Sequence, residues 1–98
     1  MAINPALKLL KKIPRGKVVT YKEFGRIAGT SPRGAASILA HNKEPDTFPC
    51  FKVVSSEGKL SGYSAPGGIK RKQALLAAEG ITFTDKGLVA RHHFYIFH

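Results

Sequence analysis

The lone cysteine of the chain, Cys50, is the residue best suited to covalent chemistry. It follows Pro49 directly and is separated by two residues from the apolar pair Val53-Val54. Because a proline fixes its own φ and pushes the preceding residue into an extended conformation, we expect the thiol at a stiff chain reversal. A thiolate held there would be a nucleophile. The alternative is a packing role, since free cysteines are among the most buried side chains.

A carboxylate is expected on the buried side of a helix over residues 69–78. Glu79 follows Leu76 by three residues, so both side chains point toward the same face. A carboxylate on a core face requires hydrogen-bonding or charged partners. The first two turns of this helix carry the basic residues Lys70, Arg71 and Lys72.

Charge separates this chain from an ordinary globular protein. Its 98 residues include 16 Lys and Arg against 6 Asp and Glu, which gives a formal net charge of +10. Such a field attracts polyanions, and we expect nucleic acid; the alternatives are a merely solubilising surface and a ribosome-associated or membrane-surface protein. We expect one domain over 1–98, without a disulfide framework, a signal peptide or a membrane span. The expected location is the cytoplasm, associated with the nucleoid, or the nucleus in a eukaryote.

Cap signals predict two short helices joined by a tight turn, over residues 21–28 and 32–41. Thr20 and Ser31 stand at the N-cap positions, and Gly29 supplies the break. This is the pattern of a helix-turn-helix. A preceding helix over 5–12 capped by Asn4, a strand over 17–20, and a terminal hairpin of 81–83 with 88–90 complete the expected elements.

Small residues line the second of these helices after Arg33, namely Gly34, Ala35, Ala36 and Ser37. They would let the helix backbone approach DNA closely, or pack tightly against a neighbouring helix; both interpretations stay open. Arg33 is either a surface charge or a residue aimed at DNA.

A β-hairpin is expected from Val53-Val54 and Lys59-Leu60, and a hairpin after a helix-turn-helix is a wing. The predicted fold class is therefore mainly α with small β-hairpins, a winged helix-turn-helix DNA-binding domain. A glycine-rich loop follows over 61–68. The C-terminal aromatics are expected to pack on the domain more readily than to form a contact surface; they are Phe83, Phe94, Tyr95 and Phe97.

These residues, in this order, resemble the C-terminal domain of the O6-alkylguanine-DNA alkyltransferases and the alkyltransferase-like proteins. The resemblance covers about 13–80 and rests on many spaced matches: Ile13-Pro14-x-Gly16-x-Val18-x-Thr20-Tyr21, Ala28-Gly29, Arg33 nine residues before Asn42, Pro49-Cys50-x-x-Val53, Gly58, Gly62-Tyr63-Ser64 and Leu75-Leu76-x-x-Glu79-Gly80.

The resemblance implies a domain that binds duplex DNA in the minor groove and flips O6-alkylguanine into a pocket. By position, Arg33 resembles the finger that fills the gap in the base stack, and Tyr21 resembles the tyrosine that meets the flipped base. Gly34 to Ser37 would then fit the groove. The lesion pocket would be formed by Asn42, Pro49, Val53, Tyr63 and Ser64.

In the implied chemistry, Cys50 takes the alkyl group irreversibly, with Glu79 in the network behind the thiol and no metal or cofactor. Members of the family place His and Arg after the cysteine, where this chain has Phe51 and Lys52. Phe51 cannot accept a proton, whereas Lys52 could partly compensate.

Three functions remain open. The first is a suicide alkyltransferase, favoured because Cys50 is retained. The second is a non-enzymatic lesion sensor that recruits nucleotide excision repair proteins. The third is a plain winged-helix regulator. In the first two, the partner is double-stranded DNA with O6-alkylguanine, and the protein is expected to be a monomer that does not bind membranes.

Overall fold

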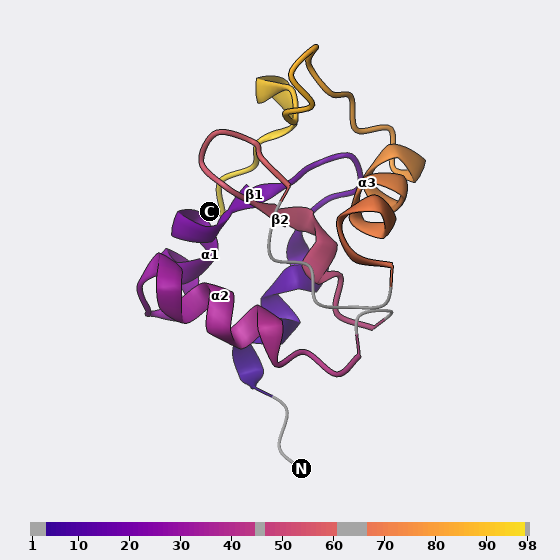
Figure 1. Ribbon diagram of the computed structural model, residues 1–98. Helices are drawn as coiled ribbons and strands as arrows, with labels where there is room; N and C mark the ends of the chain where they lie inside the picture. Colours follow the sequence, from indigo (N-terminus) through magenta and orange to yellow (C-terminus); the bar gives the residue numbers. More distant parts are fainter. Residues whose placement is uncertain (1–3, 45–46, 61–66, 98) are drawn as a thin grey trace.

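The computed structural model describes residues 4–44, 47–60 and 67–97 (Figure 1). Helices α1 and α2 lie on one side of a two-stranded sheet, and α3 lies on the other side. The elements in chain order are η1 (Pro5–Lys12, a 3-10 helix), β1 (Val19–Thr20), α1 (Tyr21–Ala28), α2 (Pro32–Ala40), η2 (Cys50–Lys52, 3-10), β2 (Val53–Val54), α3 (Gly68–Ala78) and η3 (Arg91–His93, 3-10).

The predicted helix-turn-helix is present, and its caps are those expected from the sequence. Thr20 Oγ1 accepts a hydrogen bond from the Glu23 N–H at 2.9 Å and so caps α1. Gly29 ends this helix with φ 78°, a left-handed conformation that favours glycine. Ser31 Oγ accepts from the Gly34 N–H at 3.1 Å and starts α2, which packs on α1.

The strand at Val53–Val54 has a different partner from the one predicted. It pairs in parallel with β1, Val19 opposite Val53 and Thr20 opposite Val54. Lys59 and Leu60 form no strand, so the expected strand pairing of Val53-Val54 with Lys59-Leu60 is wrong. Ser55 and Lys59 instead close a tight turn, in which the Ser55 N–H donates to the Lys59 carbonyl at 3.2 Å. Both valines of β2 are fully buried, which is typical of parallel strands covered on both faces.

The terminal hairpin is confirmed. Phe83 and Val89 are antiparallel partners, and the Thr84 N–H donates to the Leu88 carbonyl at 2.7 Å. The chain then runs beside Val18, whose N–H donates to the His93 carbonyl at 2.9 Å.

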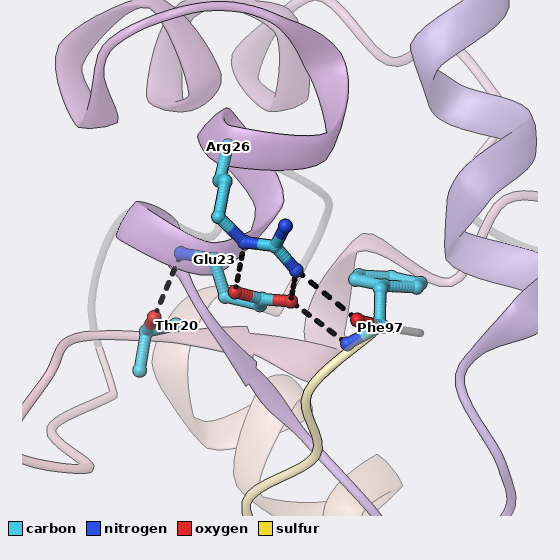
Figure 2. Close-up of polar contacts among 4 residues, drawn as sticks. All are labelled: Thr20, Glu23, Arg26 and Phe97. Atoms are coloured by element: carbon cyan, nitrogen blue, oxygen red, sulfur yellow. Dashed lines mark hydrogen bonds and ion pairs between the residues drawn. The ribbon is translucent and has the colours of Figure 1, made fainter.

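The end of the chain is fixed to α1 by a buried carboxylate (Figure 2). Glu23 Oε2 accepts from the Phe97 N–H at 2.8 Å and pairs with Arg26 Nη2 at 2.7 Å. Arg26 also donates to the Phe97 carbonyl at 3.1 Å. The tail is therefore part of the folded domain.

Two apolar clusters form the core. One joins η1, β1, α1, α2 and β2 and includes Phe24, Leu39 and Phe97; the other lies toward α3 and includes Val18, Val54 and Leu76. The tail aromatics pack on these clusters, as expected: Phe97 is buried, Tyr95 packs on the first cluster, and Phe83 and Phe94 pack on the second.

Within the described ranges, no helix combines the length and the apolar character that crossing a bilayer requires.

Candidate functional site

Cys50 lies at the chain reversal predicted for it. It is the first residue of η2, directly after Pro49, and its N–H donates to the Phe48 carbonyl at 2.7 Å. The cysteine is half-buried and packs against the first apolar cluster. Because the 3-10 turn passes straight into β2, which is paired with β1, the position of the thiol is fixed by the sheet.

Asn42 bonds to the segment that leads into Cys50. Its Nδ2 donates to the Phe48 carbonyl at 2.9 Å, and its Oδ1 accepts from the Glu44 N–H at 3.0 Å. The amide thus spans both ends of the loop before the cysteine. Asn42, which the resemblance places among the lesion-pocket residues, therefore holds the loop that leads into Cys50.

The two residues after Cys50 point into different parts of the structure. Phe51 packs against the second apolar cluster. Lys52 is 3% exposed, and its Nζ lies 2.8 Å from Glu79 Oε1. The same ammonium donates to the carbonyls of Pro14 at 2.7 Å and Ile13 at 3.2 Å. A buried charge requires this degree of pairing.

Glu79 is therefore held by groups other than a relay histidine. Besides Lys52, its Oε1 accepts from the Gly16 N–H at 3.1 Å. The prediction of a partnered carboxylate on the inner side of α3 is confirmed. In place of the family's histidine, an ion pair to Lys52 engages this carboxylate.

Lys72 is the site residue that sequence reasoning missed. It is 1% exposed, and its Nζ donates to the Val53 carbonyl at 2.7 Å. Burial lowers the pKa of Lys72 from 10.5 to about 8, against an opposing electrostatic effect of Cys50. Helical spacing could have revealed this residue, because Lys72 precedes the buried Leu76 by four positions and shares its face.

Tyr21 completes the group around the thiol. It is the first residue of α1, is half-buried, and packs on the same apolar cluster as Cys50. The Lys72 ammonium lies 5.9 Å from the centroid of the Tyr21 ring. The fold thus places Tyr21 of α1 beside Lys72 of α3 and on the same apolar cluster as Cys50 of η2.

The candidate DNA-binding residues of α2 divide into two sets. Arg33, Ala36 and Ser37 are exposed. Ala35 is 0% exposed and belongs to the core, so it packs inside the domain and is not part of a DNA-binding surface. Gly34 is half-buried, and a Cβ at this position would collide with the Thr30 side chain. Close internal packing therefore explains Gly34 and Ala35, while Ala36 and Ser37 remain candidates for contact with DNA.

The candidate lesion pocket is described only in part. Tyr63 and Ser64 lie outside the described residues. Pro49 and Asn42 are half-buried, but the Val53 side chain is 0% exposed in the core, so it does not line an open pocket. The Val53 carbonyl accepts a hydrogen bond from Lys72.

Within the described part of the chain, no group of three or more His, Cys, Asp or Glu residues could hold a metal ion.

The fold and the grouping around Cys50 define a small helical DNA-binding domain of the alkyltransferase type. A family model described as "6-O-methylguanine DNA methyltransferase, DNA binding domain" matches residues 4–81. The chain belongs to this family.

Relatives and solved structures agree with this assignment. The methylated-DNA–protein-cysteine methyltransferase of Methanothermobacter thermautotrophicus is 43% identical over 76 residues, which are 78% of this chain and 42% of that protein. The corresponding protein of Pyrobaculum aerophilum is 43% identical over 84 residues, 86% of this chain and 55% of that protein. The chain thus spans about half the length of these curated relatives.

Among solved structures, S. pombe Atl1 in complex with damaged DNA containing O6-carboxymethylguanine superimposes with a TM-score of 0.74 at 25% identity. The match covers 92% of this chain and 90% of Atl1.

Proposed function

We propose that this domain binds duplex DNA, receives a flipped O6-alkylguanine beside Tyr21, and transfers the alkyl group irreversibly to Cys50. The observation that carries the proposal is the half-buried thiol at the start of η2, with the preceding loop held by Asn42 and with Tyr21 packed on the same apolar cluster as the thiol. Similarity to the methylated-DNA–protein-cysteine methyltransferases supports this chemistry.

The reaction is a single displacement. A bond forms between Cys50 Sγ and the alkyl carbon as the bond from that carbon to guanine O6 breaks. The electron pair of the broken bond leaves with guanine, which takes up one proton, and the thioether is permanent. Each chain therefore acts once, and the step uses neither a metal nor a cofactor.

The DNA-binding surface is formed by the exposed part of α2. Arg33 stands in its first turn, and the small side chains of Ala36 and Ser37 leave room for a narrow groove. Base flipping costs a few kcal/mol, which an inserted arginine and phosphate contacts can offset. The net charge of +10 supplies the long-range attraction to DNA.

A second candidate is a lesion sensor that binds O6-alkylguanine without transferring the alkyl group and recruits nucleotide excision repair proteins. Two observations favour it: Phe51, which packs against the second apolar cluster, stands where the family has its histidine, and Glu79 is already paired with Lys52. The almost complete mutual coverage with Atl1, solved with damaged DNA, also fits this candidate. In either function the protein acts as a monomer, in the cytoplasm or nucleus.

A binding and mass experiment separates these functions. The protein is mixed with a duplex that carries one O6-methylguanine, and both its affinity and its intact mass are measured, with Cys50→Ser as the control. Alkyl transfer predicts a gain of one methyl group that Cys50→Ser lacks. Lesion-selective binding at unchanged mass would support the sensor, and equal affinity for undamaged duplex would exclude both.

A further inference from the structure

The exposed side of α2 extends beyond the residues already assigned to it. Its exposed residues follow the helical spacing i, i+3, i+4, i+7 and i+8, and they are Arg33, Ala36, Ser37, Ala40 and His41. Ala35 and Leu39 are buried on the other side, in the core. The surface that begins with Arg33 in the first turn therefore ends with a histidine at the C-cap of the same helix.

The imidazole of His41 has a fixed orientation. Its Nδ1 lies 2.8 Å from the Ser37 carbonyl oxygen, and because a carbonyl oxygen only accepts, Nδ1 carries a proton and donates it. The same carbonyl accepts from the His41 N–H at 3.2 Å, so the ring is held against the last turn of the helix. Among the described residues, Nδ1 is the ring nitrogen that makes a hydrogen bond, which leaves Nε2 available to a ligand.

We infer that His41 binds a DNA phosphate through Nε2 and takes up one proton as the complex forms. This deepens the proposed function, because it rests on α2 as the DNA-binding surface. With Nδ1 already carrying a proton, a neutral ring presents Nε2 as an acceptor, and an acceptor cannot bind a phosphate oxygen. A second proton, taken from solvent and returned to it when the DNA dissociates, makes Nε2 a charged donor.

The distance between Arg33 and His41 suits a contact with the phosphate backbone. Eight residues of α-helix advance about 12 Å along the axis, whereas the minor groove is about 6 Å wide. When the Arg33 end of α2 enters the groove, the opposite end lies outside it, at the level of the sugar–phosphate backbone. A contact there positions the helix on any duplex and does not distinguish a lesion from an ordinary base.

The charges around His41 favour an anionic ligand. The C-terminal end of a helix carries a partial negative charge, which stabilises an imidazolium at the C-cap of α2. The next charged residues along the chain are Lys43 and Glu44, both exposed. Helix α2 packs on α1 and η1, whose charged residues are Lys22, Glu23, Arg26, Lys8, Lys11 and Lys12. Glu23 is paired with Arg26, and within the described ranges no carboxylate forms an ion pair with the imidazole.

Binding of undamaged duplex tests the inference without any alkyl transfer. Dissociation constants are measured by fluorescence anisotropy at pH 6 and pH 7.5 for wild type, His41→Asn, His41→Lys and His92→Asn. His92 is an exposed histidine of η3, which lies away from α2 in Figure 1, so His92→Asn is the matched control.

On going from pH 7.5 to pH 6, wild type should gain about fourfold more affinity than His41→Asn gains, and His92→Asn should follow wild type. His41→Lys carries a permanent charge, so it should bind tightly at both pH values without the additional gain. A His41→Asn variant that keeps the wild-type pH dependence would overturn the inference. Equal losses of that dependence in His41→Asn and His92→Asn would overturn it as well.

A saturating duplex with one O6-methylguanine separates this inference from the proposed alkyl transfer. If His41→Asn lacks the pH effect but is still methylated on Cys50 to the wild-type extent, His41 is a phosphate contact, as we expect. Loss of methylation at unchanged duplex affinity would make His41 part of the reaction and would overturn the inference. Proton-linked binding without methylation of any variant would refute only the alkyl transfer.

Discussion

Lys52 and Glu79 form an ion pair, with Nζ 2.8 Å from Oε1, directly behind the turn that carries Cys50. The pair links η2 to the C-terminal end of α3, and the Gly16 N–H bonds to the same carboxylate oxygen. The resemblance to the alkyltransferases implies that this carboxylate belongs to the hydrogen-bond network behind the Cys50 thiol. Here its ionic partner is a lysine, and the residue that follows Cys50 is Phe51, whose side chain cannot accept a proton.

Lys52→Met is expected to lower the free energy of unfolding by about 3 kcal/mol, because it leaves the Glu79 carboxylate without its ionic partner. Urea unfolding measures the change. Lys52→Met combined with Glu79→Gln should recover part of the loss, and Lys59→Met, at an exposed lysine, should change little. Equal losses from Lys52→Met and Lys59→Met would show that the pair does not stabilise the fold.

Phe51→His is expected to destabilise the domain by about 1–3 kcal/mol without restoring fast alkyl transfer. The ring packs against the second apolar cluster, and Glu79, which would orient a histidine, is bound to Lys52. Single-turnover kinetics with an O6-methylguanine duplex measures the rate. An acceleration of tenfold or more would contradict the view that Lys52 has replaced the histidine network.

Stability should depend on pH through Lys72. The folded state loses this proton near pH 8, whereas the unfolded chain holds it to about pH 10.5. Between these values the unfolded state binds more protons, so the free energy of unfolding rises with pH relative to a variant without the group. Below about pH 8 both states are protonated, and the cost of burying the ammonium is fully present.

The measurement for Lys72 is the difference in unfolding free energy between wild type and Lys72→Met at pH 7 and at pH 10. It should shift in favour of wild type by up to about 3 kcal/mol on going to the higher pH. A difference that is constant across this range would show that Lys72 titrates normally in the folded state.

Arg33→Ala should weaken lesion binding more than non-specific binding. Arg33 is exposed in the first turn of α2, next to the small residues that are also exposed. A side chain that fills the gap in a base stack contributes only when a base is flipped, whereas a phosphate contact contributes on any duplex. Titrations with lesion-containing and undamaged duplex, with the exposed Lys22→Ala as control, measure this. Equal losses on both duplexes would reduce Arg33 to a phosphate contact.

Local signals predicted the helices well, and long-range pairing poorly. Thr20, Gly29 and Ser31 are cap residues whose physics is local, and each performs its expected role. Val53-Val54 is too short to specify its partner, so the parallel pairing with Val19-Thr20, over 30 residues earlier, was not predictable from pattern.

Burial of individual side chains was predicted less well. Ala35 was one of a run of small residues, and only its position on the inner face of α2 separates it from Ala36 and Ser37. Lys72 is one of three basic residues at the start of a helix, and because buried lysines are rare, nothing in this pattern distinguishes it from the other two. The sequence-based motif identified Cys50, Asn42 and Glu79, but not the buried Lys72.

The central claim is tested most directly by counting lesions and adducts in one reaction. A duplex with a single O6-methylguanine is incubated with excess protein, the DNA is digested to nucleosides, and the peptide containing Cys50 is quantified from the same sample. The account predicts that each O6-methylguanine lost appears as one guanine and one S-methyl group on Cys50, and that Cys50→Ser leaves the lesion intact. Saturated binding with the lesion intact and Cys50 unmodified would contradict it.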